Sequence, residues 1–432
     1  MLYIKRRNQL FRDLARTDLN QFRKRYIKLR CDILEKCYGK GHVKTHIRNR
    51  SDSSFLSFIY DDLVSSPEQK QRNTNYENLT PDHLLQCQEE SAVSQCTESP
   101  NAFCENFSFS GVHHIFDHHS DAVNCIKFAN KDKSFLCSAS SDGTLALYQL
   151  TPSPATILFQ FRGHLGPVMS FDWSHSDDQI VSCSFDATIR LWSTKNGSCL
   201  RVFEDPEKEP ITVCAFHPSN NNMIVTGNLK GNLNIVNLSI GVHSKNAVQV
   251  CDGQICSLRF QSDGKLLWIG DCRGFITTFR FEMEDSKLVN VSKVIIVAGC
   301  PITSLSISGD KLLLANCACN AVVLFSYQKA DNLFSFEFIK SFPIKHNTRN
   351  LMIKSAFCPS SAQTPYQPVC IVTGSEDTTV YFYSYDMKKN RCVNRLQGHS
   401  ATIIDVCFNR DESLFASADQ KGNIIIWKRD QF

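Results

Sequence analysis

Short runs of alternating apolar and polar residues recur along most of the chain, and residues 161–192 show the repeating unit most completely. A Gly-His turn leads into a first run with apolar residues on one face, Val168, Phe171 and Trp173. A second run covers residues 180–184, and a third ends at Trp192 after a turn at Asp186. Period-two alternation between turn residues predicts three successive strands. A single unit has open edges and cannot bury its apolar face alone, so we expect it to recur.

The unit recurs seven times from about Val112 onward. The closing residue of the third strand returns at a spacing of 44, 44, 43, 46, 58 and 44, at Tyr148, Trp192, Val236, Phe279, Phe325, Tyr383 and Trp427. The apolar anchors of the first strands give a second ruler, at Val123, Val168, Ile211, Ile255, Ile302, Met352 and Ile403. A period near 44 with four short strands per unit is typical of β-propeller blades. The predicted fold is therefore an all-β, seven-bladed propeller.

Two departures from the period have a simple interpretation. The step of 58 contains residues 359–368, which we expect to form an inserted loop. The last unit ends soon after Trp427 and lacks a fourth strand, and residues 112–117 are the natural donor of that strand. Such a join of early and late segments would close the ring and remove its open edges.

The residues before the repeats differ sharply in charge. Residues 1–50 carry 15 Lys and Arg against 4 Asp and Glu, whereas residues 51–105 carry 2 against 10. Mixed three- and four-residue apolar spacing predicts a basic helical arm over residues 1–38. Residues 39–105 are polar and acidic without a sustained period, which predicts a disordered linker. The predicted domains are thus 1–38, 39–105 and 106–432.

The arm has two interpretations. It could bind nucleic acid or an acidic protein, or its apolar side could pack on the propeller. Its densest basic cluster is a candidate for nuclear targeting or polyanion binding, at Arg23, Lys24, Arg25, Lys28 and Arg30. The linker holds two Ser-Pro dipeptides, at Ser66 and Ser99, which are candidates for phosphorylation. The basic pattern is already under way at Tyr3, so a longer form of the chain is one interpretation.

The repeats resemble those of the WD40 family. The likeness rests on Gly163-His164 with Asp186 and Trp192, on Gly398-His399 with Trp427, and on a weaker copy at His118-His119 with Asp142 and Tyr148. Several stretches also resemble one member of that family more closely, at residues 216–228, 270–279, 372–383 and 396–417 and in the doubled Tyr-Ile-Lys arm motif. The resemblance implies a regulatory protein found largely in the nucleus, without catalytic activity of its own.

In the WD40 pattern a His, a second-strand Ser or Thr, a turn Asp and the closing Trp share a hydrogen-bonded network that fixes each blade. The resemblance places these roles at His119, Ser138, Asp142, Tyr148, His164, Ser182, Asp186, Trp192, Thr373, Asp377, Tyr383, His399, Ser417 and Trp427. By this count residues 161–192 form the one unit that keeps all four groups. Basic residues stand where Asp is expected in three turns, which makes them candidates for partner binding: Lys230, Arg273 and Lys421.

Other chemistry finds little support in the chain. The adjacent histidines of residues 113–119 would alternate between the two faces of a strand, so we expect no metal site there. No phosphate-binding or hydrolase motif occurs, and we expect neither catalytic residues nor a cofactor. The N-terminus lacks the apolar core of a secretory signal, so the 20 cysteines are expected to be reduced thiols.

The sequence therefore predicts a non-enzymatic scaffold that binds proteins or peptides on its propeller rim within a nuclear regulatory complex. The alternative is a protein that associates with nucleic acid or chromatin through its basic arm. The expected location is the nucleus, with the cytoplasm second, and no membrane is involved.

Overall fold

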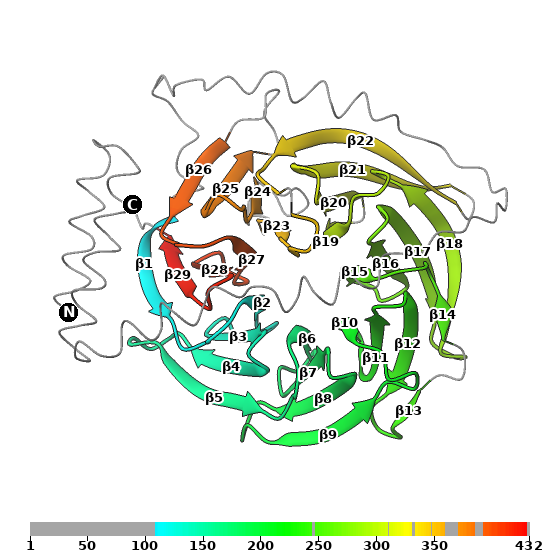
Figure 1. Cartoon of the computed structure of the whole chain (residues 1–432), viewed down its shortest axis with the longest axis horizontal. Helices are drawn as coiled ribbons and strands as arrows, with labels where there is room; N and C mark the ends of the chain where they lie inside the picture. Colours follow the sequence, from blue (N-terminus) through cyan, green and yellow to red (C-terminus); the bar gives the residue numbers. More distant parts are fainter. Residues whose placement is uncertain are drawn as a thin grey trace. The chain divides into compact units, whose positions relative to one another are not determined.

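The computed structural model describes residues 109–243, 247–309, 311–330, 333–346, 348–358, 370–384 and 392–429. These residues form an all-β ring of seven antiparallel sheets (Figure 1), which confirms the predicted seven-bladed propeller. The predicted arm (1–38), the linker (39–105) and the insertion at 359–368 lie outside the described residues, and so does the basic cluster from Arg23 to Arg30.

Each of the first four blades has its strands in sequence order from the centre outward. Blade 1 contains β2 (Val123–Phe128), β3 (Phe135–Ser140), β4 (Thr144–Gln149) and β5 (Thr156–Arg162). Blade 2 contains β6 (Val168–Trp173), β7 (Gln179–Ser184), β8 (Thr188–Ser193) and β9 (Cys199–Glu204). Blade 3 contains β10 (Ile211–His217), β11 (Asn220–Asn228), β12 (Asn232–Asn237), β13 (Val242–His243) and β14 (Val248–Gln249). Blade 4 contains β15 (Ile255–Phe260), β16 (Leu266–Asp271), β17 (Phe275–Glu282) and β18 (Lys287–Ile295).

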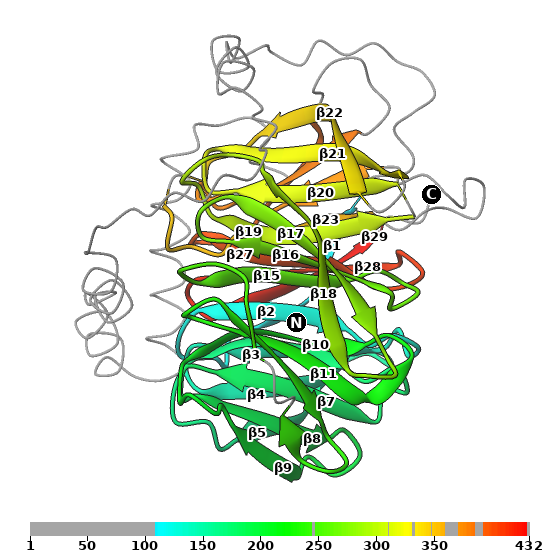
Figure 2. The ribbon, with the colours of Figure 1, turned by 90° about the vertical axis from the view of Figure 1, so that its right-hand side faces the viewer.

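The last three blades complete the ring, and Figure 2 shows their strands running along its axis. Blade 5 contains β19 (Ile302–Ser308), β20 (Leu312–Cys317), β21 (Ala321–Ala330) and β22 (Leu333–Pro343). Blade 6 contains β23 (Ser355–Phe357), β24 (Cys370–Thr373), β25 (Thr379–Ser384) and β26 (Cys392–Gln397). Blade 7 contains β27 (Ile403–Phe408), β28 (Leu414–Asp419), β29 (Ile424–Arg429) and, as its outer strand, β1 (Phe109–Phe116).

The hydrophobic core lies between neighbouring blades. The cluster around Phe171 and Trp192 joins blades 1 and 2, for example, and another around Val123 and Ile424 joins blades 1 and 7. Burying one large apolar side chain contributes about 1.5–3 kcal/mol, so each face is stabilised only when its neighbour is present. The repeat pattern thus dictates a closed ring.

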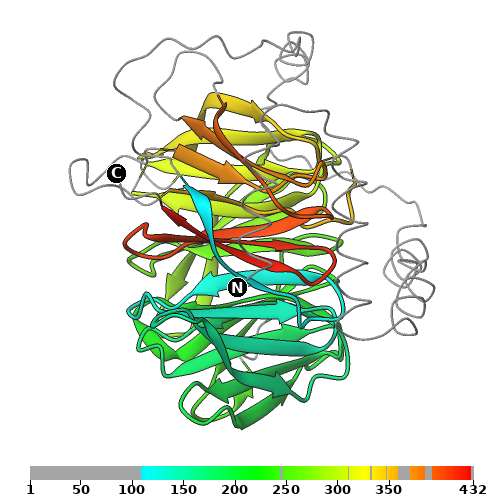
Figure 3. The same ribbon diagram turned by 90° about the vertical axis from the view of Figure 1, so that its left-hand side faces the viewer.

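The ring closes through β1, which pairs with β29 in antiparallel register, Val112 with Trp427 and Phe116 with Ile424. Figure 3 shows the cyan β1 against the red β29. The predicted donor strand is confirmed, and the structure extends it back to Phe109. The phenyl side chain of Phe109 is only 2% exposed and packs among Phe382, Phe408 and Phe415.

Candidate interaction surface

The turn rim is the edge of the ring formed by the seven turns that join the second and third strands of the blades. All seven turns lie within the described residues and fall into three groups. Blades 1, 2 and 6 have an Asp near the middle of the turn, at Asp142, Asp186 and Asp377. Blades 3, 4 and 7 have an Asn or Asp two positions earlier and a basic residue in the middle, at Lys230, Arg273 and Lys421. Blade 5 has Cys319 in that middle position.

Blades 1 and 2 carry the expected chain of hydrogen bonds. In blade 2, His164 Nδ1 donates to Asp186 at 2.9 Å, Ser182 donates to His164 Nε2 at 2.7 Å, and the Trp192 indole N–H donates to Ser182 at 2.8 Å. Blade 1 repeats this geometry, with the hydroxyl of the closing tyrosine 2.6 Å from the serine, through His119, Ser138, Asp142 and Tyr148. These side chains are largely buried, so the networks hold the blades together and leave little free for a partner.

Blade 7 also carries a complete network, which corrects the prediction that residues 161–192 alone do so. His399 Nδ1 lies 3.0 Å from Asp419 Oδ2, while Ser417 and Trp427 complete the chain at 2.7 and 2.8 Å. The carboxylate comes from Asp419, two residues before Lys421, which occupies the position of Asp186 in blade 2. It reaches the same histidine because the turn is built differently.

Blade 6 does not form the predicted network of Thr373, Asp377 and Tyr383. Asp377 accepts from Tyr381 at 2.6 Å, and the Tyr383 hydroxyl donates to the Pro343 carbonyl. The blade has Thr348 at the histidine position, so no imidazole can bridge the turn to the second strand.

Thr373 belongs instead to a buried chain that ties blade 6 to blade 5. Ser355 Oγ donates to Thr373 Oγ1 at 2.9 Å and accepts from Asn316 at 2.7 Å. The amide oxygen of Asn316 lies 3.0 Å from His346, a fully buried histidine two positions before the expected one. The structural role survives with different residues.

The three basic turn residues share one turn geometry. In each turn the leading Oδ1 accepts two backbone N–H groups, at 3.1 and 2.8 Å for Asn228 and at 2.9 Å twice for both Asp271 and Asp419. A glycine with φ between 84° and 89° follows each basic residue and makes the turn possible: Gly231, Gly274 and Gly422.

Two of the three basic side chains have acidic partners. Lys230 pairs with Glu209 at 2.6 Å, and Arg273 lies 3.6 Å from Asp252. Lys421 is exposed and has no acidic partner within 4 Å among the described residues. The charges of Lys230 and Arg273 are therefore partly neutralised by their neighbours. Exposed ion pairs contribute only about 0–1 kcal/mol, so this pairing adds little stability. Lys421 is the member of this set most open to a partner.

Asp271 and Asp419 show how the histidine sets the acidity of the turn. Burial raises the pKa of Asp271, and Cys251 stands where blade 7 has His399, so Asp271 Oδ2 has no hydrogen-bond partner. Burial acts in the same direction on Asp419, but hydrogen bonds from His399 and Asn423 outweigh it and lower the pKa of that carboxyl. The same backbone turn therefore stabilises the charged carboxylate in blade 7, whereas in blade 4 burial disfavours the charged form.

Two Lys–Asp clasps on the inner strands were not predicted from the sequence. Asp172 accepts from Lys127 of blade 1 at 3.1 Å and from the Phe216 N–H of blade 3 at 2.9 Å. Asp405 accepts from Lys354, on the segment leading into blade 6, at 3.0 Å and from the Ile126 N–H of blade 1 at 2.9 Å. Each clasp thus connects three consecutive blades. The sequence feature that could have revealed the clasps is a charged residue inside an otherwise apolar first strand.

The clasp lysines remain charged in spite of their surroundings. Partial burial lowers the pKa of Lys127 and Lys354, but the facing carboxylates outweigh it, so the pKa of each lysine is raised. Paired in this way, the charges stabilise the ring and are poorly available for an incoming ligand.

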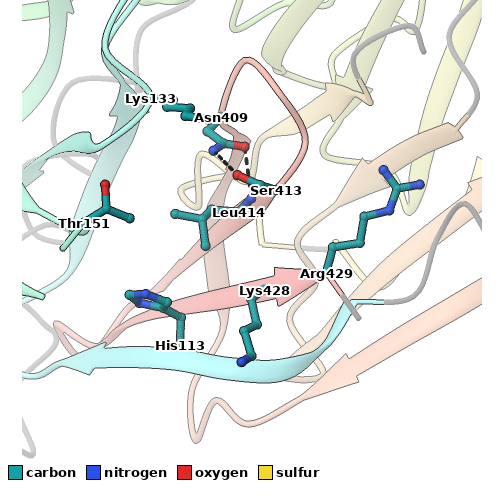
Figure 4. Close-up of a pocket in the computed structure, with 8 residues that line it drawn as sticks. All are labelled: His113, Lys133, Thr151, Asn409, Ser413, Leu414, Lys428 and Arg429. Atoms are coloured by element: carbon teal, nitrogen blue, oxygen red, sulfur yellow. Dashed lines mark hydrogen bonds between the residues drawn. The ribbon is translucent and has the colours of Figure 1, made fainter. Parts of the chain in front are cut away.

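Two cavities lie away from the turn rim. One, of about 340 Å³, opens where the first strands end and includes Trp173, His217 and Arg259 in its lining. The other, of about 510 Å³, lies between blades 7 and 1 (Figure 4) and is lined by His113, Lys133, Thr151, Asn409, Ser413, Leu414, Lys428 and Arg429. Lys133 and Arg429 already pair with Asp411 and Glu412, so the basic character of this cavity is partly neutralised.

An apolar residue stands out on the turn rim. Leu165 follows His164 directly and is 93% exposed, more than any other large apolar side chain among the described residues. Its N–H donates to Asp186 at 2.9 Å, and the next carbonyl, of Gly166, accepts from Ser184 at 3.1 Å. Hydrogen bonds to the blade 2 turn therefore fix the loop backbone, while the leucine side chain faces solvent.

Metal and membrane chemistry find no support in the described part of the chain. No group of three or more His, Cys, Asp and Glu residues there could hold a metal ion. No helix in that part is long and apolar enough to cross a membrane.

A closed ring of antiparallel blades, three of them fixed by a network of His, Ser, Asp and a closing Trp or Tyr, is typical of WD-repeat propellers. The family model described as WD domain, G-beta repeat matches residues 111–149, 155–193 and 390–428. These segments contain the network residues of blades 1, 2 and 7. The family model and the WD-repeat relatives together support WD40 repeats in this chain, and such repeats are typical of propeller scaffolds for protein interactions.

Relatives and solved structures agree with this class. The chain is 25% identical over 321 residues to the WD repeat-containing protein 26 homolog of Arabidopsis thaliana, covering 73% of this chain and 50% of that protein. It is 25% identical to the serine-threonine kinase receptor-associated protein of Dictyostelium discoideum, covering 72% and 96%. The β-propeller domain of Myceliophteria thermophila Cps50 (Swd1) superposes with a TM-score of 0.60 at 16% identity over 74% of this chain and 99% of that one. The chain spans about half the length of the Arabidopsis relatives.

Proposed function

We propose that the protein is a scaffold that binds a partner protein across its turn rim, with Leu165 as an apolar anchor. The observation that carries this proposal is a leucine 93% exposed on a loop fixed by a buried network. A preorganised loop loses little conformational freedom on binding, so burial of the leucine adds to affinity almost undiminished. Complete burial would contribute about 1.5–3 kcal/mol, the range of an interface hot spot.

The charges around the rim suggest which charge the partner carries where it contacts blade 7. Lys421 is exposed and makes no ion pair with the described residues, whereas Lys230 and Arg273 are already paired. Lys421 stands on blade 7, and Leu165 lies on the loop that enters blade 2. A partner that covers blades 7, 1 and 2 would meet an apolar contact at one end and a positive charge at the other.

The experiment compares partner capture by the full chain and by two variants, Leu165→Glu and Ile240→Glu. Ile240 is a matched control, because it is 69% exposed and lies in the turn between β12 and β13, on the opposite rim. Quantitative mass spectrometry after affinity capture should show partners lost with Leu165→Glu and retained with Ile240→Glu, with both variants folded by circular dichroism. Equal retention by the two variants would refute the role of the turn rim.

We further propose that the scaffold works in a nuclear regulatory complex, with the cytoplasm as a second location. The resemblance of residues 216–228, 270–279, 372–383 and 396–417 to the WD repeat-containing protein 13 group supports this proposal. So does the basic cluster from Arg23 to Arg30, which fits an import signal. Imaging of the tagged full chain should show nuclear signal that falls when Arg23, Lys24 and Arg25 are changed to alanine together.

A second candidate function is association with nucleic acid or with an acidic protein through the basic arm. The observation that favours it is the excess of 15 Lys and Arg over 4 Asp and Glu in residues 1–50. Phosphate contacts release counterions, so binding to duplex DNA should weaken steeply as log[salt] rises, with a slope of about −0.9 per phosphate contacted. Anisotropy titrations of the full chain with duplex DNA between low and high salt would detect that slope, and a flat response would refute the nucleic-acid function.

A further inference from the structure

Blade 5 lacks the His–Asp pair of blades 1, 2 and 7 and has two cysteines near its turn, Cys300 and Cys319. Cys319 occupies the position that Asp186 has in blade 2, because Cys317 pairs with Ala321 as Ser184 aligns with Thr188 across the earlier turn. The next residue has positive φ in both turns, 65° at Asn320 and 60° at Ala187. The loop before β19 has alanine at the histidine position, and Cys300 follows two residues later.

The backbone brings Cys300 next to this turn. The Ala318 N–H donates to the Pro301 carbonyl at 3.1 Å, as the Phe185 N–H donates to Pro167 at 3.0 Å in blade 2. Cys300 therefore corresponds to Gly166, and Cys319 corresponds to Asp186. In blade 2, a Cβ atom added to Gly166 would lie 3.6 Å from the Cβ atom of Asp186. Disulfides need Cβ atoms about 3.5–4.5 Å apart, so the repeat geometry places these two positions at bonding separation.

The chemistry of the cluster favours one nucleophile. Hydrogen bonds from the Cys317 and Cys300 thiols lower the pKa of Cys319, in spite of its partial burial. The pKa of Cys300 is raised, mainly by burial, and that of Cys317 is raised well above its usual value by its bond to Cys319 and by complete burial. Cys319 is thus the group that carries thiolate character, and the thiolate is the reactive form.

The site is open to a small reagent. Cys300 and Cys319 are both partly exposed, and Ala298 and Gly299 beside them are exposed. A Cβ atom added to Gly299 would meet nothing within 4 Å. A peroxide can therefore approach from the turn rim, whereas Cys317 is fully buried behind the turn.

We propose that Cys300 and Cys319 form a redox-sensitive thiol pair that closes to a disulfide when the protein meets a hydroperoxide. The Cys319 thiolate attacks the peroxide oxygen, the O–O bond breaks, and protonation of the departing oxygen releases water or an alcohol and leaves Cys319 as the sulfenic acid. Cys300 then attacks that sulfur as a thiolate, water leaves, and the S–S bond forms. The disulfide would join the blade 5 loop covalently to its turn, where blades 1, 2 and 7 use a His–Asp hydrogen bond.

The test uses the reduced full chain, treated with one equivalent of hydrogen peroxide at pH 7 and then blocked with N-ethylmaleimide. Peptide mapping should find Cys300 linked to Cys319. Cys199 is the matched control, because it is an exposed thiol on β9 that lies outside any such cluster. We expect Cys319 to react faster than Cys199, because hydrogen bonds from the Cys317 and Cys300 thiols favour the Cys319 thiolate.

Two variants separate the steps. Cys300→Ser should leave the sulfenic acid on Cys319, trapped by dimedone, and Cys319→Ser should abolish both the adduct and the disulfide, whereas Cys199→Ser should change neither. The wild-type peptide map needs no variant to fold and decides the matter by itself. A Cys317–Cys319 link, reaction of Cys199 at least as fast as Cys319, or the absence of any disulfide involving Cys300 would each overturn the proposal.

Discussion

Asp419 and Asp271 offer a controlled comparison inside one molecule. Both carboxylates are buried, and both accept two backbone N–H groups at 2.9 Å in the same kind of turn. Blade 3 builds that turn with Asn228, so asparagine supports this backbone. Changing each aspartate to asparagine should therefore keep the turn and remove only the negative charge.

The expected effects differ because the charge has a partner in only one blade. Asp419→Asn removes the charged acceptor of His399, and hydrogen bonds to charged groups contribute about 1.5–3 kcal/mol, so we expect a loss near 2 kcal/mol. Asp271 Oδ2 is buried without a hydrogen-bond partner. Neutralising it relieves the cost of an unpaired buried charge, so Asp271→Asn should be neutral or stabilise by up to about 1 kcal/mol.

The pH dependence gives an independent check. The lowered pKa of Asp419 means that its contribution is present above the ordinary carboxyl pKa of about 4 and is lost as the pH falls below it. The raised pKa of Asp271 has the opposite sign, since its penalty applies at neutral pH and fades on acidification. Urea unfolding followed by tryptophan fluorescence, at pH 7 and near pH 3, measures both. The reasoning fails if Asp271→Asn destabilises as much as Asp419→Asn at pH 7.

Three further predictions concern the ring. Asp405→Asn should cost about 2–3 kcal/mol, because it removes the charge that pairs with Lys354 and leaves one acceptor oxygen where two serve Lys354 and the Ile126 and Val406 N–H groups. The cost should exceed that of Asp172→Asn, whose pair is more exposed; thermal unfolding in parallel compares them, and the reverse order would contradict the role of burial. Deletion of residues 1–118 removes β1 and should abolish the soluble fold, whereas deletion of 1–100 should not; equal melting temperatures would contradict closure through β1. Ser417→Ala should lower stability by about 1–3 kcal/mol, because His399 and the Trp427 N–H both lose a buried partner; an unchanged urea midpoint would show that the blade 7 network is not needed.

The blade count and the closing strand could be predicted from the sequence because both follow from periodicity. Alternating apolar positions at a period near 44 leave few folds that bury every face, and the missing fourth strand of the last unit requires a donor. Residues 112–117 supplied it, although the strand begins at Phe109. Phe109 precedes the alternating run, and only the tertiary packing of its ring reveals its role.

The hydrogen-bonded residues were harder to predict, because several turns reach the same contacts from different positions. A fixed spacing from the closing aromatic residue identifies Asp142 and Asp186 but misses Asp419, which stands two residues earlier in its turn. It also grouped Thr373 with Tyr383, although Thr373 bonds through Ser355 and Asn316 to a neighbouring blade. Contacts between neighbouring blades join residues far apart in sequence, 30 positions for Asn316 and His346 and 51 for Lys354 and Asp405, and a pattern confined to one strand and its turn cannot show them.

The uneven distribution of polar contacts divides the ring into a firmer and a softer half. Blades 7, 1 and 2 have complete networks, and the Asp172 and Asp405 clasps connect the blades on either side of the closing strand. Buried polar atoms without partners among the described residues are more numerous in blades 3 and 4, on Asn228, Trp268, Asp271, Thr277, Thr278 and Ser292. Blades 7, 1 and 2 have fewer, on His113, His118 and Arg190. Proteins open locally where stabilising contacts are sparse, in cooperative units. Amide exchange should therefore begin in blades 3 and 4, opposite the point where the chain closes on itself, so the seam of the ring would be among the last parts to open.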